Sequence, residues 1–243
     1  MRQLNIGICG LGTVGSGVLS VLQNNADIIR EKSSCLIHVT HVATRNTNHG
    51  CNVENIQFSN DIFEVARDSD IDLVVELIGG TSSALELVML AISNGKHVVT
   101  ANKALIAEHG TSILQAAYEA NVIVAFEASV AGGIPILKSI REGLVANKIN
   151  WLAGIINGTT NFILSEMSSK GRSFESALEE AQKRGYAEAD PTFDIEGIDA
   201  SQKLSILTSM SFGMTLPLDH LFTEGITKIP LKDVYSAKEL GFT

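Results

Sequence analysis

The stretch Leu4–Gly15, LNIGICGLGTVG, decides the fold of this 243-residue chain. Its first part, LNIGIC, is a short apolar run that predicts a strand, and from Thr13 onward apolar residues recur at helical spacing. Between them lies a Gly-x-Gly-x-x-Gly turn, whose first glycine allows a tight turn, whose second admits a pyrophosphate and whose third lets helix pack on strand. The stretch therefore predicts a dinucleotide site at a helix N-terminus, with contacts from Gly10, Gly12, Thr13, Val14 and Gly15.

Strands and helices alternate through the first half of the chain. Continuous apolar runs predict further strands over residues 37–43, 71–77, 97–100 and 122–126, and helical periodicity predicts helices over residues 84–93 and 104–120. Such alternation is typical of a doubly wound parallel sheet, so we expect an α/β fold of the Rossmann type. The alternation stops after Glu127, which places a dinucleotide-binding domain at residues 1–130 and a second, α+β domain at residues 131–243.

Polar residues follow the predicted strand ends, where ligands of such sheets bind. Lys103 comes almost directly after a buried strand, so it could reach both a nicotinamide and a substrate, although an ordinary lysine at a helix start is the alternative. Glu127 follows the last strand of the series. The cofactor contacts expected at this edge are Thr81, Thr100, Asn102 and Lys103.

The strand over residues 37–43 leads into Thr44-Arg45-Asn46, where an NAD-specific site would usually carry an acidic residue for the ribose 2′-hydroxyl. An arginine can instead pair with a 2′-phosphate, so Arg45 favours NADP. A solvated loop arginine is the alternative, and NAD therefore stays open as the cofactor.

The second domain contains an acidic segment beside an apolar helix, GYAEADPTFDIEGIDASQK at residues 185–203. Asp199 and Lys203 are four residues apart on a helix predicted over residues 198–212, so they share one face, beside an apolar stripe. The lysine ammonium should point toward packed structure, either in a structural ion pair or in a catalytic role. Upstream, residues 149–157 read as a strand, and Gly158-Thr159-Thr160-Asn161 could cap the next helix or hold a substrate carboxylate.

The composition limits the possible partners and compartment. A formal net charge of −9 argues against a nucleic-acid binder. The cysteines Cys9, Cys35 and Cys51 form no CxxC pair, so neither a disulfide framework nor a zinc site is expected. No apolar run approaches the roughly 20 residues of a membrane span, and no signal peptide precedes the first strand. We expect a cytoplasmic protein that acts on a small molecule, without a membrane or nucleic-acid partner.

Six blocks resemble the homoserine dehydrogenase family, in the order of that family and along essentially the whole chain. They are GLGTVGSGV (10–18), VVELIGGT (74–81), GKHVVTANKALIAEHG (95–110), FEASVAGGIPI (126–136), INGTTNFIL (156–164) and GYAEADPTFDIEGIDASQKL (185–204). The resemblance implies NAD(P)-dependent interconversion of aspartate 4-semialdehyde and homoserine in threonine, methionine and isoleucine biosynthesis. It also implies a homodimer, formed through the substrate domain.

The resemblance also implies roles for individual residues. Lys203 is implied as the proton donor to the aldehyde oxygen, Lys103 as a second catalytic lysine and Asp199 as the group that orients Lys203. Glu188 would bind the substrate amino group, with Asp194, Gly158 and Thr159 as further substrate contacts. A monovalent-cation site suited to sodium would use Glu127, Val130, Gly132 and Ile134.

The chain departs from the family pattern at three places. Asn46 stands where an aspartate often follows the arginine, and Thr160 stands where a cysteine is common. The chain stops at Thr243, where family members continue through the rest of the catalytic region and often into a regulatory ACT domain, so we expect a C-terminal truncation and no basis for feedback control by threonine. No aspartate kinase domain is expected before Met1.

Three alternatives remain at this point. The chain could be an inactive fragment of the dehydrogenase. It could be a non-catalytic dinucleotide sensor, which would have no use for Lys103 and Lys203 beside an acidic cluster. A semialdehyde dehydrogenase that forms an acyl-phosphate would need a nucleophilic cysteine near the nicotinamide, and none of the three cysteines is placed for this role.

Overall fold

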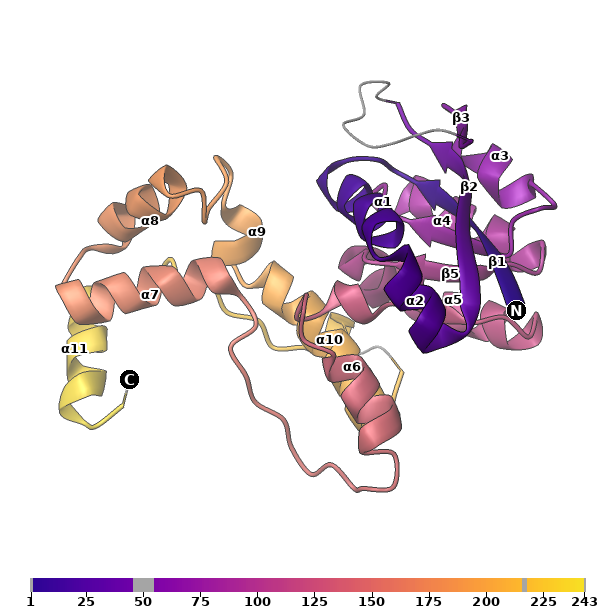
Figure 1. Cartoon of the computed structure of the whole chain (residues 1–243). Coiled ribbons are helices and arrows are strands. Elements are labelled where there is room, and N and C mark those ends of the chain that lie inside the picture. Colours follow the sequence, from indigo (N-terminus) through magenta and orange to yellow (C-terminus); the bar gives the residue numbers. More distant parts are fainter. Residues whose placement is uncertain (1, 46–54, 216–217, 243) are drawn as a thin grey trace. The chain divides into compact units, whose positions relative to one another are not determined.

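The structure is a computed structural model that describes residues 2–45, 55–215 and 218–242 (Figure 1). It divides into two compact units, Met1–Gly143 and Leu144–Thr243. The division falls later in the chain than the expected domain boundary at residue 130, because the loop and turn after Glu127 fold back onto that residue. Its carboxylate accepts hydrogen bonds from the amides of Leu137 and Lys138.

The first unit contains a parallel sheet of six strands in the order β3-β2-β1-β4-β5-β6. The strands are β1 (Arg2–Cys9), β2 (Cys35–Ala43), β3 (Gln57–Ser59), β4 (Leu73–Glu76), β5 (His97–Thr100) and β6 (Val124–Ala125). Each neighbouring pair is parallel, and the order reverses between β1 and β4. The predicted doubly wound α/β sheet of the Rossmann type is therefore confirmed.

The described helices of the first unit cover both faces of this sheet, apart from the short last one, which packs on the neighbouring turns. They are α1 (Thr13–Asn24), α2 (Ala26–Ser33), α3 (Ile62–Arg67), α4 (Ser82–Ser93), α5 (Lys103–Glu119) and α6 (Ile136–Lys138), with a 3-10 turn at Glu127–Ser129 and a π-helical turn at Ser139–Gly143. In β1, Ile6 and Ile8 pack with Leu19 of α1, whereas Gly7 faces Val65 of α3. The continuous apolar strands follow from this burial on two sides.

The second unit is built from helices in its described residues. They are α7 (Gly158–Lys170), α8 (Phe174–Lys183), α9 (Thr192–Ile195), α10 (Ile198–Phe212) and α11 (Leu231–Glu239), with a 3-10 turn at Leu218–His220. Figure 1 shows α8 and α11 on either side of α7. Ile163 and Met167 of α7 pack with Ala177 and Ala181 of α8 in one buried cluster.

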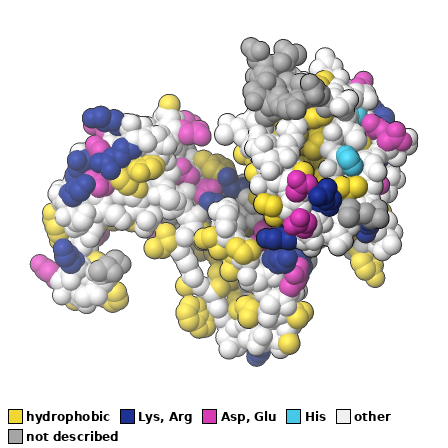
Figure 2. All heavy atoms as spheres, viewed as in Figure 1, with side chains coloured by type: hydrophobic (Ala, Val, Ile, Leu, Met, Phe, Trp, Pro, Cys, Tyr) yellow, Lys and Arg dark blue, Asp and Glu magenta, His cyan; other side chains and the backbone are white. Residues whose placement is uncertain are grey.

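Acidic and basic side chains lie beside one another over α7 and α8 (Figure 2). Arg172 joins the two helices, because its guanidinium lies 3.5 Å from Glu166 and 3.4 Å from Glu180. Glu180 also pairs with Arg184 at 2.6 Å. These hydrogen-bonded guanidinium groups lower the pKa of the Glu180 carboxyl below its ordinary value. Of the described helices, none combines the length and the apolar composition that crossing a bilayer requires.

The strand predicted over residues 149–157 is wrong. This segment has no regular secondary structure and pairs with no described strand, and Trp151 and Ile155 are 76% and 79% exposed. An apolar alternating segment becomes a strand only when a neighbour takes up its N–H and C=O groups, and no described segment of the second unit does so. Helix α10, by contrast, has the predicted bounds. Its buried face includes the polar Asp199 and Gln202, not only the predicted apolar stripe.

Gly15 and Gly17 of α1 offer a test of the glycine turn. An alanine methyl at Gly15 would overlap the carbonyl oxygen of Gly10, whereas one at Gly17 would meet no atom within 4 Å. We expect Gly15→Ala to lower the free energy of unfolding by about 1–3 kcal/mol, because the backbone must move. Gly17→Ala should raise it by about 0.5–1 kcal/mol, because alanine loses less entropy in a helix. Denaturant melts of both variants measure the difference, and equal effects of the two substitutions would contradict the packing role of Gly15.

Candidate active site

The glycine turn lies at the carboxyl end of β1, beside β4. Gly10 has a φ of 100°, and a Cβ there would lie 2.5 Å from Leu77 O, so only glycine fits this turn. Gly15 packs against the Gly10 carbonyl, while the space beside Gly12 is open for 4 Å. Helix α1 follows directly, and its first N–H groups favour an anion. The three glycines therefore differ in their surroundings in the way that the sequence pattern predicts.

The loops after β4 and β5 carry the other predicted cofactor residues of the first unit. Thr81 is the residue before α4, and Asn102 caps α5 by accepting a hydrogen bond from the Leu105 amide at 3.1 Å. Lys103, the first residue of α5, is half-buried. Thr100 is buried, and its hydroxyl oxygen accepts a hydrogen bond from the Asn102 amide at 2.9 Å. These residues all lie at the edge where such sheets bind ligands.

Arg45 lies two residues beyond the end of β2 and is exposed. The neighbouring Thr44 amide donates to Ser59 O at 2.9 Å, which anchors the chain just before the arginine. The guanidinium thus extends from a fixed backbone at the strand end where a ribose 2′ substituent is read. Asn46 lies outside the described residues.

Lys203 of α10 is held by two acceptors in the second unit. Its Nζ donates to Asp199 Oδ2 at 2.6 Å and to the backbone oxygen of Ile156 at 2.8 Å. The Lys203 side chain is 20% exposed, and its Asp199 partner 6%. An ammonium carries three hydrogens, and no described residue accepts the third. The predicted direction of the lysine, toward packed structure, is confirmed.

Asn157 is a residue that the sequence analysis did not single out. It is 7% exposed, and its Nδ2 donates to Asp194 Oδ1 at 2.7 Å and to Asp199 Oδ2 at 2.8 Å. Its Oδ1 accepts from the Thr160 amide at 2.8 Å, which caps α7. One amide group thus joins two acidic residues of the segment 185–203 to the start of another helix. The N-cap position could have been found from the sequence, but the link to the two aspartates could not.

The predicted substrate residues surround this amide. The Thr159 hydroxyl lies 2.9 Å from Asp194 Oδ2 and 2.8 Å from Tyr186 O. Asp194 is thus held at both carboxylate oxygens, at Oδ1 by Asn157 and at Oδ2 by Thr159. No described residue accepts a hydrogen bond from the backbone amides of Gly158 and Thr159, at the start of α7. Glu188 is exposed, and its backbone oxygen accepts from Gln182 Nε2 at 3.1 Å. This part of the unit therefore offers amides at a helix start and an exposed carboxylate.

The predicted cation residues occupy one loop of the first unit. Both Glu127 oxygens accept backbone hydrogen bonds, and Ile134 O accepts from the Ile136 amide at 2.8 Å. No described residue donates to the backbone oxygens of Val130 and Gly132, which are therefore available to a hard cation. Within the described part of the chain, no cluster of three or more His, Cys, Asp and Glu side chains could hold a metal ion. Of the four predicted ligands, Val130 and Gly132 thus keep a backbone oxygen that no described residue engages, whereas the Glu127 carboxylate and Ile134 O already accept hydrogen bonds.

The described cysteines are not placed as nucleophiles. Cys9 is fully buried in β1, and burial raises the pKa of its thiol, with the nearby Glu76 and Asp61 carboxylates adding to this effect. Cys35 is the first residue of β2, at the amino end of that strand. Cys51 lies outside the described residues. Neither described thiol fits acyl-enzyme chemistry.

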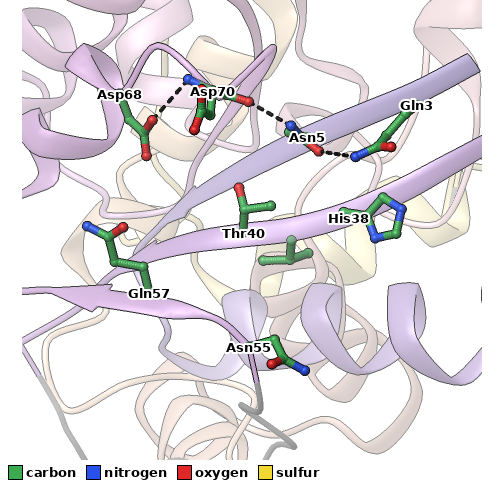
Figure 3. A pocket seen from close by; sticks show the side chains of 9 residues that line it. Gln3, Asn5, His38, Thr40, Asn55, Gln57, Asp68 and Asp70 are labelled. Atoms are coloured by element: carbon green, nitrogen blue, oxygen red, sulfur yellow. Dashed lines mark hydrogen bonds between the residues drawn. The ribbon is translucent and has the colours of Figure 1, made fainter.

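A polar cavity of 520 Å³ lies elsewhere on the first unit (Figure 3). Asn5 of β1 donates to Asp70 O at 2.8 Å, and the Asp70 amide donates to Asp68 Oδ1 at 3.0 Å. His38 and Thr40 line it from the middle of β2. The cavity lies away from the carboxyl edge of the sheet, and no sequence-predicted site residue lines it.

The structure therefore forms two separate groups of predicted residues. The glycine turn and the residues of the loops after β2, β4 and β5 belong to the first unit, together with the predicted cation loop. Lys203, Asp199, Asp194 and Thr159 are connected through Asn157 or direct hydrogen bonds in the second unit. Glu188 belongs to the same unit but is not hydrogen-bonded to this network through its carboxylate.

Family models match both units of the chain. The family model for the NAD-binding domain of homoserine dehydrogenase matches residues 10–127, and the model for homoserine dehydrogenase matches residues 135–243. Homoserine dehydrogenase of Pseudomonas aeruginosa is 59% identical over 242 residues, which are 100% of this chain and 56% of that protein. The chain therefore spans about half the length of this relative.

Solved structures give the same result. A homoserine dehydrogenase from Thiobacillus denitrificans superposes with a TM-score of 0.93 at 53% identity, over 99% of this chain and 56% of that one. A protein from Archaeoglobus fulgidus, assigned as a homoserine dehydrogenase, superposes with a TM-score of 0.86 at 32% identity, over 99% of this chain and 78% of that one. With both units matched in sequence and in structure, the chain belongs to the homoserine dehydrogenase family.

Proposed function

We propose that this chain carries the cofactor-binding and catalytic residues of an enzyme that reduces aspartate 4-semialdehyde to homoserine, in threonine, methionine and isoleucine biosynthesis. The observation that carries the proposal is the geometry of Lys203, whose ammonium is fixed by two acceptors and keeps one N–H without an acceptor among the described residues. We assign the dinucleotide to residues 1–130 and the substrate to residues 131–243.

Lys203 supplies the proton that the reaction needs. When a hydride reaches the carbonyl carbon, the oxygen gains negative charge, and the third N–H of the ammonium donates its proton there. Asp199 and Ile156 O hold the amine in place throughout, so its direction does not depend on solvent. Because the side chain is 20% exposed, water can return the proton afterwards. Lys103 is proposed as the second catalytic lysine, at the start of α5.

The substrate is an amino acid, and the second unit has groups for both of its charges. Glu188 is exposed and would bind the ammonium through a charge-assisted hydrogen bond. The amides of Gly158 and Thr159 would bind the carboxylate at the start of α7, where the helix dipole favours an anion. Asp194 keeps its orientation through Asn157 and Thr159, and is proposed as a further orienting group of the substrate site.

The cofactor is a nicotinamide dinucleotide, as the match to the family's NAD-binding domain indicates. Its reduced ring supplies the hydride. The open space at Gly12 and the N-terminus of α1 suit the pyrophosphate, and the exposed Arg45 supports NADP over NAD. A sodium ion on the Glu127–Ile134 loop and a homodimer in the cytoplasm complete the proposal. Of the alternatives, a non-catalytic sensor would not need the fixed lysine.

Lys203 gives the most direct test of this activity. We build a chimera in which this chain replaces the aligned part of the P. aeruginosa relative, so that the remaining half of that enzyme is present. Turnover is followed by the absorbance of the NADPH that forms from homoserine and NADP. Lys203→Met should lower kcat by about 100-fold or more, since the variant lacks the amine that takes up the hydroxyl proton in this direction, the reverse of the proposed donation, while NADPH affinity stays unchanged. Lys170→Met removes a similar i,i+4 ion pair, with Glu166 on α7, and should leave kcat unchanged.

When the assay is run on the chimera and on the isolated chain, three outcomes separate the hypotheses. An inactive chimera whose chain still binds NADPH would overturn the dehydrogenase proposal in favour of a sensor. Activity in the chimera but not in the isolated chain would identify the chain as an inactive fragment of the enzyme. A Lys203→Met chimera with full turnover would refute the proton-donor role alone.

Asn157 and Ser173 form a matched pair of helix caps. Both accept a hydrogen bond from an amide three residues later, but only Asn157 also donates to Asp194 and Asp199. Replacing either by alanine should lower the free energy of unfolding by about 0.5–2 kcal/mol. Only Asn157→Ala should also lower kcat in the same chimera, by about tenfold or more, because it releases the Asp199 that orients Lys203. Equal kcat in the two variants would show that Asn157 is only a cap.

Arg45 provides the test of cofactor choice. Arg45→Ala should raise the KM for NADP by about 10- to 100-fold, since a charge-assisted contact to the 2′-phosphate is lost. The KM for NAD should change little. Arg30→Ala, on the exposed surface of α2, serves as the control and should affect neither cofactor. An unchanged KM for NADP would remove Arg45 from the cofactor site.

A further inference from the structure

Glu76 is a fully buried carboxylate at the carboxyl end of β4, and none of the functions proposed above uses it. Its Oε1 accepts hydrogen bonds from the amides of Ile78, at 2.9 Å, and Gly79, at 3.3 Å. Its Oε2 accepts from the Thr100 hydroxyl at 2.5 Å. A carboxylate without contact to water is costly unless donors surround it. These three bonds therefore define one position for the side chain.

The hydrogen bonds continue from Glu76 across the next strand. Thr100 Oγ1, which donates to Glu76, accepts from the Asn102 amide at 2.9 Å. Asn102 in turn donates through Nδ2 to Gly80 O at 2.6 Å and accepts from the Leu105 amide through Oδ1. The loop after β4 and the loop after β5 are thus joined twice, once through the Glu76 carboxylate and once through the Asn102 amide.

The position of Glu76 in the sheet gives this network its importance. In register, Glu76 lies opposite Cys9 of β1 on one side and opposite Thr100 of β5 on the other. The strand order reverses between β1 and β4, and dinucleotides bind at the carboxyl ends of strands beside such a reversal. Since the phosphates are assigned to the glycine turn after β1, the nicotinamide half of the cofactor is assigned to the loops after β4 and β5.

We propose that Glu76 is a positioning residue for the nicotinamide half of the cofactor. It holds the Gly79–Thr81 loop and the Asn102–Lys103 turn in one arrangement, so that their backbone and side chains are preorganised before the ring arrives. Hydride transfer from the ring rests on the proposed function, whereas the binding of the ring does not.

A purely structural role for Glu76 predicts a different result. If the carboxylate only stabilised the sheet, its loss would weaken all ligands of the first unit together with the fold. A positioning role weakens only the part of the cofactor that contacts the two loops. The two halves of the cofactor can be tested separately, because adenosine 2′,5′-bisphosphate contains the adenosine half without the nicotinamide.

The experiment compares Glu76→Gln with the unchanged 243-residue chain by titration calorimetry, using NADPH and adenosine 2′,5′-bisphosphate. A glutamine has one oxygen and one NH2 group, so it cannot accept from both the loop amides and Thr100. We expect NADPH affinity to fall by about tenfold or more, and the affinity for the bisphosphate to stay within about twofold. Glu86→Gln is the matched control, since Glu86 is exposed on α4, and should bind both ligands normally.

Thr100→Val removes the hydroxyl that links Glu76 to Asn102, and it provides a second variant if Glu76→Gln does not fold. It should reproduce the selective loss of NADPH affinity, and the double variant should lose little more than either single variant. Unchanged NADPH binding, or an equal loss for both ligands, would overturn the proposal. Because calorimetry needs no turnover, a failure of the homoserine activity would leave these results in place and separate the two proposals.

Discussion

Buried carboxylates determine the arrangement of polar groups in both units, because each must be surrounded by hydrogen-bond donors. Asp199 is 4% exposed and accepts through Oδ2 from Lys203 and Asn157. Glu76 is fully buried and accepts from two amides and a hydroxyl. Since an unpaired buried charge would cost several kcal/mol, the donors cannot move independently of the acid. A lysine beside such an acid acquires a fixed direction, and a loop beside it acquires a fixed shape.

Asn157 shows how this constraint connects distant parts of the chain. Its amide group is limited to two donors and an acceptor, and the donors reach two aspartates while the oxygen caps α7. The start of α7, the Asp194 turn and the first turn of α10 are therefore positioned by one side chain. The amides of Gly158 and Thr159 then have a defined direction relative to Asp194 and Lys203, as binding of the proposed substrate through several polar groups would require.

The sequence predicted the elements whose signals are local. The glycine turn, five of the six strands of the described first unit and the bounds of α10 follow from apolar periodicity and from glycine positions, and the structure contains them, whereas the three-residue β3 was missed. The strand over residues 149–157 was wrong, since pairing depends on a neighbour that a local pattern does not reveal. α2 and α3 were missed because eight and six residues are too few for a periodic signal. Asn157 and Glu76 were missed for a related reason, as their partners lie up to 42 residues away in the chain.

The same reasoning explains why the family was recognisable from the sequence although the hydrogen-bond partners of individual residues were not. The blocks that carry the resemblance contain the residues with the strictest local demands: glycines in turns that no side chain could occupy, and polar groups at the ends of strands and helices. Five of them also contain a member of the buried networks or the glycine turn, such as Glu76 in residues 74–81, Thr100 in 95–110 and Asn157 in 156–164. The sequence of a block can therefore be matched to the family before the hydrogen bonds of its residues are known. The role of each residue depends on which donor meets which acid, and only the folded structure of each unit provides that pairing.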